Sequence, residues 1–257
     1  MIELKTPGEI EAMREAGRVV ATTLAAVREA ARPGVSLLEL NEVAATVIAE
    51  AGAKPAFLGY HPDWAPSPFP GVICTSVNDA IVHGVPGRSV LGDGDLVSID
   101  SAVVLDGWCG DAAVSFVVGS GLASVADLAV ISATERALAA GIAQAVPGNR
   151  LGDIAHAIGV VARAEGYGIM EGYGGHGIGR TMHESPHVAN EGRAGRGMVL
   201  RPGLTLAVEP MFTGGGLDSY RTDADGWTLR TVDGSRAAHS EHTIAVTGDG
   251  VVVLTAL

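Results

Sequence analysis

Apolar side chains near the start of the chain recur at the spacing of an amphipathic helix. Ile10, Met13, Val20, Leu24 and Val27 fall on one face of a helix with roughly 3.6 residues per turn. The preceding residues 6–9, Thr-Pro-Gly-Glu, combine a capping box with proline at the first helical position. The pattern therefore predicts a helix over residues 7–31, which the Pro-Gly pair at 33–34 ends.

The helix that follows occurs twice in the chain. A capping box at Ser36 and Glu39 opens it, and Gly52 ends it. A later stretch ending at Gly166 repeats its pattern at a constant offset of 114 residues (52 to 166). The matched apolar positions are Leu37, Leu40 and Val47 in the first copy and Leu151, Ile154 and Val161 in the second.

Each copy of this helix belongs to a larger repeated unit. An amphipathic stretch over residues 124–145 precedes the second copy, as residues 7–31 precede the first. Each half also contains an apolar run that ends in an acid, at residues 96–100 and 204–209. We expect an α+β fold, one domain over residues 1–257 with repeated halves at 1–119 and 120–257. Such halves meet at a central cleft, which is a favoured position for a site.

Two aspartates of the first half end strand-like runs. Asp100 follows the run 96–99, and the turn at Asp106-Gly107 would return the chain so that Asp111 lies beside Asp100. A buried carboxylate is unfavourable unless something binds it, so two converging carboxylates indicate a metal or a shared proton. The alternative is a pair of exposed turn aspartates, and the hairpin alone does not decide between the two.

Two histidines stand out by their surroundings. His83 lies in an apolar, strand-like segment, where a histidine is more often a hydrogen-bonded core residue than a catalyst. His176 lies in the glycine-rich run 174–179, where the glycines allow close backbone approach. A phosphate-binding loop is the competing interpretation of this run, but the strand-then-helix context that it requires does not fit.

Residues 183–187, His-Glu-Ser-Pro-His, match the pattern of helical zinc-peptidase sites. That motif needs both histidines on one helical face. Pro186 would cost ~3 kcal/mol or more inside a helix, and the glycine run before it provides no helix. We therefore do not expect a zinc site of this type.

Glu209 and Glu241 complete the set of candidate ligands, the first following and the second beginning a strand-like run. Together with Asp100, Asp111 and His176 they form an oxygen-rich set without a thiolate. Such a set suits divalent metals such as Mn, Fe, Co or Zn, and carboxylates can bridge two ions.

Composition argues against several other classes of function. The net charge of −12 disfavours nucleic-acid and anionic-membrane partners. No uncharged apolar run reaches the ~18 residues that a membrane span needs, and the charged opening segment shows no signal peptide. The only cysteines, Cys74 and Cys109, do not form a disulfide framework. We expect a cytoplasmic protein that binds neither nucleic acid nor membranes.

Seven short motifs occur in order along the chain. They are Cys74-Thr-Ser-Val-Asn-Asp-Ala-Ile-Val-His83-Gly-Val-Pro, Ser98-Ile-Asp100, Gly110-Asp111, Gly174-Gly-His176-Gly-Ile-Gly-Arg, Met182-His183-Glu-Ser-Pro, Glu209-Pro and Glu241-His-Thr. Each motif is weak alone, but together they give the chain a close resemblance to the type I methionine aminopeptidases over nearly its whole length. The resemblance implies the pita-bread (creatinase/aminopeptidase-like) α+β fold, with pseudo-two-fold symmetry around a central sheet.

The resemblance also implies a binuclear metal centre with two divalent ions (Mn, Fe, Co or Zn). Its ligands would be Asp100, Asp111, His176, Glu209 and Glu241, of which Asp111 and Glu241 would bridge the ions. A water between the ions could be a hydroxide at neutral pH and would attack the first peptide bond. Glu209 would act as general base and then as general acid.

The implied activity is removal of the N-terminal methionine from nascent proteins, with a preference for a small second residue. His83 would hold the scissile amide nitrogen, and His183 would stabilise the oxyanion. Side chains suited to a thioether fall where the family lines its methionine pocket, although packing alone is an equal alternative for the two sulfur-bearing ones. These side chains are Tyr60, Cys74, Met182 and Trp227. The expected partners are nascent N-termini near the ribosome, and we expect a monomer.

The sequence departs from the family pattern at Phe57, Cys109 and Met182 and in a longer loop over residues 62–70. None of these positions is a predicted ligand, so they bear on substrate preference more than on activity. Proline-specific peptidases of the same fold are the nearest alternative, but they usually carry an extra N-terminal domain, for which we expect no room before Thr6. Binding modules that have lost their metals are disfavoured because all five ligand positions are filled.

Overall fold

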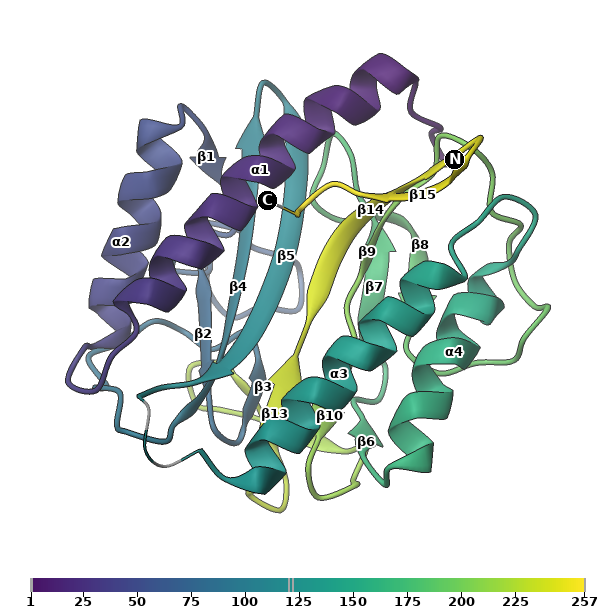
Figure 1. Cartoon of the computed structure of the whole chain (residues 1–257). Helices are drawn as coiled ribbons and strands as arrows, with labels where there is room; N and C mark the ends of the chain where they lie inside the picture. The colour runs from purple at the N-terminus through teal and green to yellow at the C-terminus, as the bar shows by residue number, and fades with distance from the viewer. Residues whose placement is uncertain (1, 120, 122, 257) are drawn as a thin grey trace.

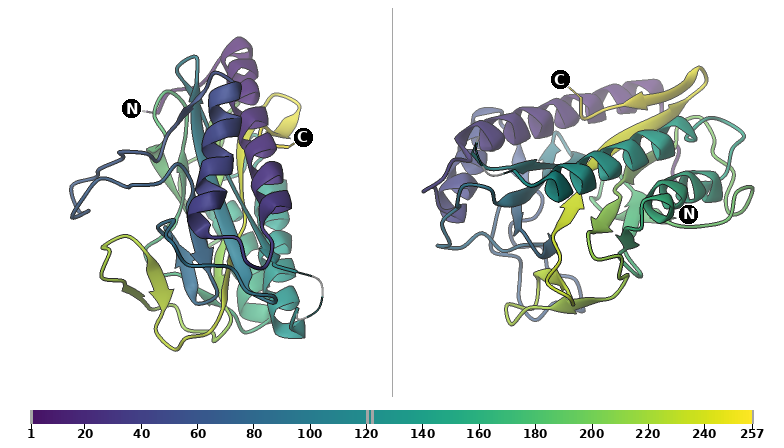
Figure 2. Two further views of the ribbon diagram at one scale, coloured as in Figure 1. Left: turned by 90° about the vertical axis from the view of Figure 1, so that its left-hand side faces the viewer. Right: turned by 60° about the horizontal axis from the view of Figure 1, so that its bottom comes forward.

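The computed structural model describes residues 2–119, 121 and 123–256, and in this part four helices cover one face of a curved β-sheet (Figure 1). The helices are α1 (Pro7–Ala30), α2 (Leu37–Glu50), α3 (Val125–Ala143) and α4 (Leu151–Ala164). The strands are β1 (Lys54–Pro55), β2 (Cys74–Val77), β3 (Ala80–Val82), β4 (Leu96–Leu105), β5 (Trp108–Val117), β6 (Gly168–Ile169), β7 (Gly174–Gly177), β8 (Glu184–Ala189), β9 (Thr205–Val208), β10 (Met211–Thr213), β11 (Tyr220–Thr222), β12 (Leu229–Thr231), β13 (Ala237–His239), β14 (Glu241–Thr247) and β15 (Gly250–Val253). Seen from the side, the helices form one layer and long loops project from the opposite face (Figure 2).

The predicted helices are confirmed to within two residues at each end. Both capping boxes form as expected: the backbone N–H of Thr6 donates to the Glu9 carboxylate at 2.8 Å, and that of Ser36 donates to Glu39 at 2.8 Å. Among the described residues, no helix has the length and apolar character of a membrane span.

The repeated helices share their backbone geometry as well as their sequence pattern. Gly34 and Gly148, which lie before the second helix of each half, have φ values of 95° and 92°. Gly52 and Gly166, which end those helices, have φ values of 70° and 78°. This left-handed region favours glycine because it has no Cβ. The matched glycines therefore make the same turns in the two halves.

The two halves meet within one large sheet, whose strands follow the order β1-β4-β5-β14-β9-β7-β8. Strand β2 pairs with β4, and β15 pairs with β14. Two three-stranded sheets, β13-β10-β6 and β11-β12-β3, complete the structure described. The antiparallel contact of β5 with β14 joins a strand of the first half to a strand of the second.

Strands β4 and β5 are longer than the sequence predicts, and their aspartates lie in mid-strand rather than at strand ends. The turn at Asp106 and Gly107 is confirmed, with both residues at positive φ. The sequence predicts a strand end at each aspartate because a charged residue inside a buried strand is unfavourable in isolation. That prediction was wrong. Regular pairing of Asp100 with Ala113 continues the ladder through this position.

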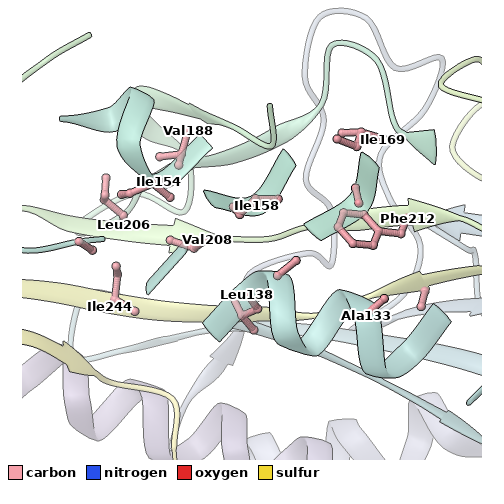
Figure 3. Packing of buried hydrophobic residues seen from close by; sticks show 14 of the residues in the cluster. Ala133, Leu138, Ile154, Ile158, Ile169, Val188, Leu206, Val208, Phe212 and Ile244 are labelled. Atoms are coloured by element: carbon pink, nitrogen blue, oxygen red, sulfur yellow. The ribbon is translucent and has the colours of Figure 1, made fainter. Parts of the chain in front are cut away.

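Alternation along the strands separates the apolar core from the polar face. Val97, Ile99 and Val103 of β4 pack in the core beneath α1 and α2, whereas Asp100 lies on the other face. A second core lies beneath α3 and α4 and is mostly aliphatic (Figure 3). It includes Ala133, Leu138, Ile154, Ile158, Ile169, Val188, Leu206, Val208, Phe212 and Ile244.

Candidate metal centre

Strand register places the predicted ligands of the central strands on one face of the sheet. Asp100 pairs with Ala113, and Ala113 pairs in turn with Glu241, so these residues form one row across β4, β5 and β14. Asp111 lies two residues before Ala113 and therefore points to the same face. Carboxylates from both halves of the chain thus meet at the β5–β14 contact.

The remaining two ligands reach this face from the outer strands of the second half. His176 in β7 pairs with Ala207 in β9, and Glu209 lies two residues beyond Ala207. A Cβ atom on Gly175 would lie 2.1 Å from the carbonyl oxygen of Ala207, so only glycine permits β7 to approach β9. The predicted close backbone approach is confirmed, and the run forms a strand rather than a phosphate-binding loop.

The side chains of this set converge. His176 Nε2 lies 4.0 Å from Asp111 Oδ2 and 3.5 Å from Glu209 Oε1. Asp111, His176 and Glu241 offer ligand atoms that all lie within 4.8 Å of one another. The Nδ1–H of His176 donates to the carbonyl oxygen of Gly177 at 2.8 Å, so the Nε2 lone pair of the neutral ring faces the carboxylates.

The backbone around these ligands is fixed by neighbouring side chains. The hydroxyl of Thr243 accepts from the N–H of Asp111 at 3.0 Å and donates to the Asp111 carbonyl at 2.8 Å. The side-chain amide of Asn190 donates to the carbonyl oxygen of Glu209 at 3.0 Å. These bonds fix the backbone from which the two carboxylates extend.

Electrostatics in the cluster favour a bound cation. Asp100 Oδ1, Asp111 Oδ1 and Glu241 Oε1 are buried without a hydrogen-bond partner among the described residues, which is unfavourable for a carboxylate. Burial raises the pKa of Asp100 to about 7 and that of Glu209 to about 8. Burial, followed by repulsion from the neighbouring carboxylates, also raises the pKa values of Asp111 and Glu241. A divalent cation would offset both penalties.

His239 was not among the site residues predicted from the sequence. This residue ends β13, two positions before Glu241, and its Nε2 lies 3.6 Å from Glu209 Oε2 and 3.9 Å from Glu241 Oε2. Glu209, His239 and Glu241 form a second group with ligand atoms within 4.8 Å of one another. The available signal was the spacing of two residues from Glu241, because side chains two apart along extended chain share a face.

His83 and His183 flank the cluster. His83 follows β3 rather than lying within a strand, with φ at 58°, because the strand ends at Val82. Its Nδ1 is buried without a partner among the described residues, unlike that of a hydrogen-bonded core histidine, and burial lowers the pKa of His83 to about 4. The ring centre of His183 lies 4.2 Å from that of His176.

One cavity of about 520 Å³ connects the five predicted ligands with the two flanking histidines. The five predicted ligands, His83 and His183 line it together with the side chains predicted for the methionine pocket. The apolar and aromatic lining consists of Phe57, Tyr60, Trp64, Phe69, Cys74, Met182, Tyr173 and Trp227. Trp64 and Phe69 come from the loop at 62–70, whose aromatic residues the sequence analysis did not assign to the pocket.

The zinc-peptidase pattern at residues 183–187 does not form a helical site. Glu184 to His187 lie in strand β8. Among the described residues, the groups able to hold a metal include neither His183 nor His187. The two histidines therefore do not share a helical face, which that motif requires.

Comparison with known proteins places this site in a family. The sequence pattern of metallopeptidase family M24 matches residues 11–248. The chain belongs to metallopeptidase family M24. A relative from Mycobacterium tuberculosis, methionine aminopeptidase 1, is 52% identical over 262 residues, which cover 99% of this chain and 95% of that protein.

Solved structures agree with this assignment. The methionine aminopeptidase of Thermotoga maritima matches with a TM-score of 0.94 and 40% identity over 100% of both chains. The prolidase of Pyrococcus furiosus is 21% identical, with a TM-score of 0.79 over 99% of this chain and 65% of that chain, and shows the shared fold alone. Within family M24 the chain therefore groups with the methionine aminopeptidases, and the predicted pita-bread fold is confirmed.

Proposed function

We propose that this chain removes the N-terminal methionine from nascent polypeptides whose second residue is small, using two divalent cations. The observation that carries this proposal is the single cavity in which a carboxylate and imidazole cluster adjoins an apolar pocket and two histidines. The 52% identity to a methionine aminopeptidase supports the same activity.

The residues present fit a pair of divalent cations. Asp111 and Glu241, which lie at the junction of the two halves, would hold the ions together with Asp100, His176 and Glu209. The unpartnered oxygens of this cluster are the ligand atoms that such ions need. When bound, the cations lower the pKa of water and polarise the substrate carbonyl.

Glu209 is the group best placed to move the proton. Its side chain is 15% exposed and lines the cavity, and burial raises its pKa in the metal-free protein to about 8, so the carboxylate can hold a proton there. It accepts the proton of the attacking water and then gives it to the leaving amine.

His83 and His183 bind the scissile peptide. Burial lowers the pKa values of both rings, so both are neutral near pH 7 and each offers one N–H donor. His183 donates to the carbonyl oxygen as negative charge develops there. His83, which lines the same cavity, binds the scissile amide at its nitrogen and positions it as the leaving group.

The methionine side chain enters the aromatic end of the cavity. The rings of Phe69 and Trp227 meet edge to face with centroids 5.1 Å apart, and Trp64 lies 5.0 Å from Trp227. Cys74 pairs with Asp100 across β2 and β4, so the floor of the pocket adjoins the metal centre directly. Aromatic edges and sulfur atoms provide favourable contacts for a thioether.

A metal add-back assay tests the proposal. Chelator-treated protein is assayed with a Met-Ala-initiated peptide and with an X-Pro dipeptide, before and after separate addition of Mn, Fe, Co or Zn. We expect release of methionine that depends on added metal, with the most active metal indicating the preferred ion. Cleavage of X-Pro without methionine release would support a prolidase, and no hydrolysis with any metal would support a binding module.

We further infer a monomer that acts in the cytoplasm on chains emerging near the ribosome. The net charge of −12 disfavours a stable contact with RNA, so the nascent chain itself is the expected partner. Light scattering of the purified protein tests the monomer directly, and a dimer mass contradicts it.

A further inference from the structure

His239 is held rigidly at the edge of the carboxylate cluster. Only 2% of the residue is exposed, and its backbone pairs with Met211 of β10. The Ser115 hydroxyl accepts from the His239 N–H at 2.9 Å and donates to the His239 carbonyl at 2.7 Å. The strand therefore fixes the position of the His239 backbone, and the imidazole ring extends toward Glu209 and Glu241.

The Nε2 atom of His239 has no hydrogen-bond partner within the described part of the chain. Its distances of 3.6 Å to Glu209 Oε2 and 3.9 Å to Glu241 Oε2 are longer than a hydrogen bond. Two ligand atoms each about 2.1 Å from one tetrahedral ion lie roughly 3.4 Å apart. The observed spacing thus resembles that of atoms arranged around a cation.

His176 provides an internal comparison. Its Nε2 lies 3.5 Å from Glu209 Oε1 and 4.0 Å from Asp111 Oδ2, which are nearly the same separations. Each oxygen of Glu209 therefore faces one imidazole nitrogen, His176 on one side and His239 on the other. The motifs that carry the family resemblance include only the first of these histidines.

We propose that His239 Nε2 is a sixth protein ligand of the metal centre, on the side formed by Glu209 and Glu241. This proposal rests on the metal-dependent function above. A second imidazole adds a nitrogen donor to a set otherwise dominated by carboxylates. It raises affinity for Co²⁺ and Zn²⁺ relative to Mn²⁺, because imidazole suits the former and carboxylate the latter.

Proton NMR of the Co²⁺-loaded wild-type chain tests the ligand directly. Protons of an imidazole bound to Co²⁺ are shifted far outside the ordinary range. We expect shifted signals from two imidazoles, His176 and His239. Signals from one imidazole only would overturn the proposal, and this result does not depend on the folding of any variant.

Calorimetric titration of chelator-treated protein with Co²⁺ and Mn²⁺ tests the energetic consequence. We expect His239→Gln to weaken one Co²⁺ binding step by at least about tenfold and Mn²⁺ binding by less. The matched control is His242→Gln. The Nδ1 atom of His242 hydrogen-bonds with the Thr255 hydroxyl at 2.8 Å on the opposite face of β14. Calorimetric titration of this variant with Co²⁺ and Mn²⁺ should therefore match that of the wild type.

Unchanged Co²⁺ affinity in His239→Gln would contradict the ligand role. A lower melting temperature of the metal-free variant with unchanged affinity would assign His239 a structural role and would equally overturn the proposal. Failure of the wild type to release methionine, with both imidazole signals present, would instead refute the proposed function alone.

Discussion

The two halves of the chain have the same scaffold but contribute different chemistry. Each half packs two helices on its strands and turns at glycines with matching φ values. In the first half, β4 and β5 are joined by the short turn at 106–107 and present two aspartates. In the second, β9 and β14 are separated by residues 209–240, which form four further strands. This long connection carries His239, whereas His176 comes from β7 on the other side of β9.

The comparison shows that symmetry positions the ligands without making them equivalent. Asp100 in β4 and Glu209, which directly follows β9, are one acid from each half, and both line the cavity. Only Glu209 has imidazole nitrogens near both of its oxygens. We therefore assign proton transfer to the second half and cation binding to both.

Substitution of the two corresponding acids should separate these roles and should give the largest effect. We expect Glu209→Gln to retain bound metal but to lower the turnover number by about 10²–10⁴, because a general acid–base contributes that much. Asp100→Asn should instead weaken binding of one cation. Turnover with a Met-Ala peptide and metal content by mass spectrometry provide the measurement, and near-normal turnover in Glu209→Gln would remove it from the proton role.

The stability of the metal-free protein should fall with rising pH in a window set by the same acids. Burial raises the pKa values of Asp100 to about 7 and Glu209 to about 8 in the fold. Their stabilising contribution is present below the ordinary carboxyl pKa and is lost as pH rises through the folded values. Melting curves should thus show a gap between metal-loaded and metal-free protein that widens from about pH 6 to about pH 8.

The buried histidines have the opposite pH dependence. The pKa values of His83 and His176 are lowered by burial to about 4 and about 3, so their contribution is present above the ordinary histidine pKa and is lost at acid pH. Asp100→Asn should make the stability of the metal-free protein depend less steeply on pH. If the stability changed equally with pH in metal-loaded and metal-free protein, the carboxylate cluster would not be the origin of the pH dependence.

Glycines in the two halves should differ in their tolerance of alanine. A Cβ on Gly17 of α1 would lie 2.2 Å from the backbone oxygen of Leu254, which cannot move aside without shifting the chain. A Cβ on Gly141 of α3 would instead meet the Ile158 side chain at 2.9 Å. We expect Gly17→Ala to lower the free energy of unfolding by about 1–3 kcal/mol and Gly141→Ala by less. Chemical denaturation measures both, and the reverse order would contradict the packing described.

Helix caps should give the smallest difference between the halves. The Ser36 hydroxyl caps α2, whereas the corresponding position of α4 is Arg150, whose side chain does not accept a capping bond. Ser36→Ala should cost about 1 kcal/mol of unfolding free energy. Arg150→Ala should cost less, because Asp153 still accepts from the backbone N–H of residue 150. Equal losses in denaturation would show that the Ser36 cap has no special role.

Local signals in the sequence were sufficient for the helices and for much of the site. Capping boxes and apolar spacing predict α1, α2 and α3 because these features act within a few residues. The hairpin turn at 106–107 and the strands before Glu209 and after Glu241 follow from similarly local patterns. The five candidate ligands were identified in this way, and the structure brings them into one cavity.

Features that depend on pairing between distant segments of the chain were harder to predict from the sequence. The continuation of β4 through Asp100 requires the register with β5 and β2, which the local run of apolar residues does not reveal. His239 lies near Glu209 only because β13 pairs with β10 and leads directly into β14. The contact of Trp64 with Trp227 likewise joins two residues that lie 163 positions apart in the chain.

We propose that carboxylates from both halves hold two cations at the β5–β14 junction. Anomalous diffraction from crystals grown with Mn²⁺ or Co²⁺ tests it most directly. We predict two peaks roughly 3.5–4 Å apart, contacted by Asp111 and Glu241 together, with Asp100 near one peak and His176 near the other. A single peak, or ions bound at His183 and His187 instead, would contradict the account.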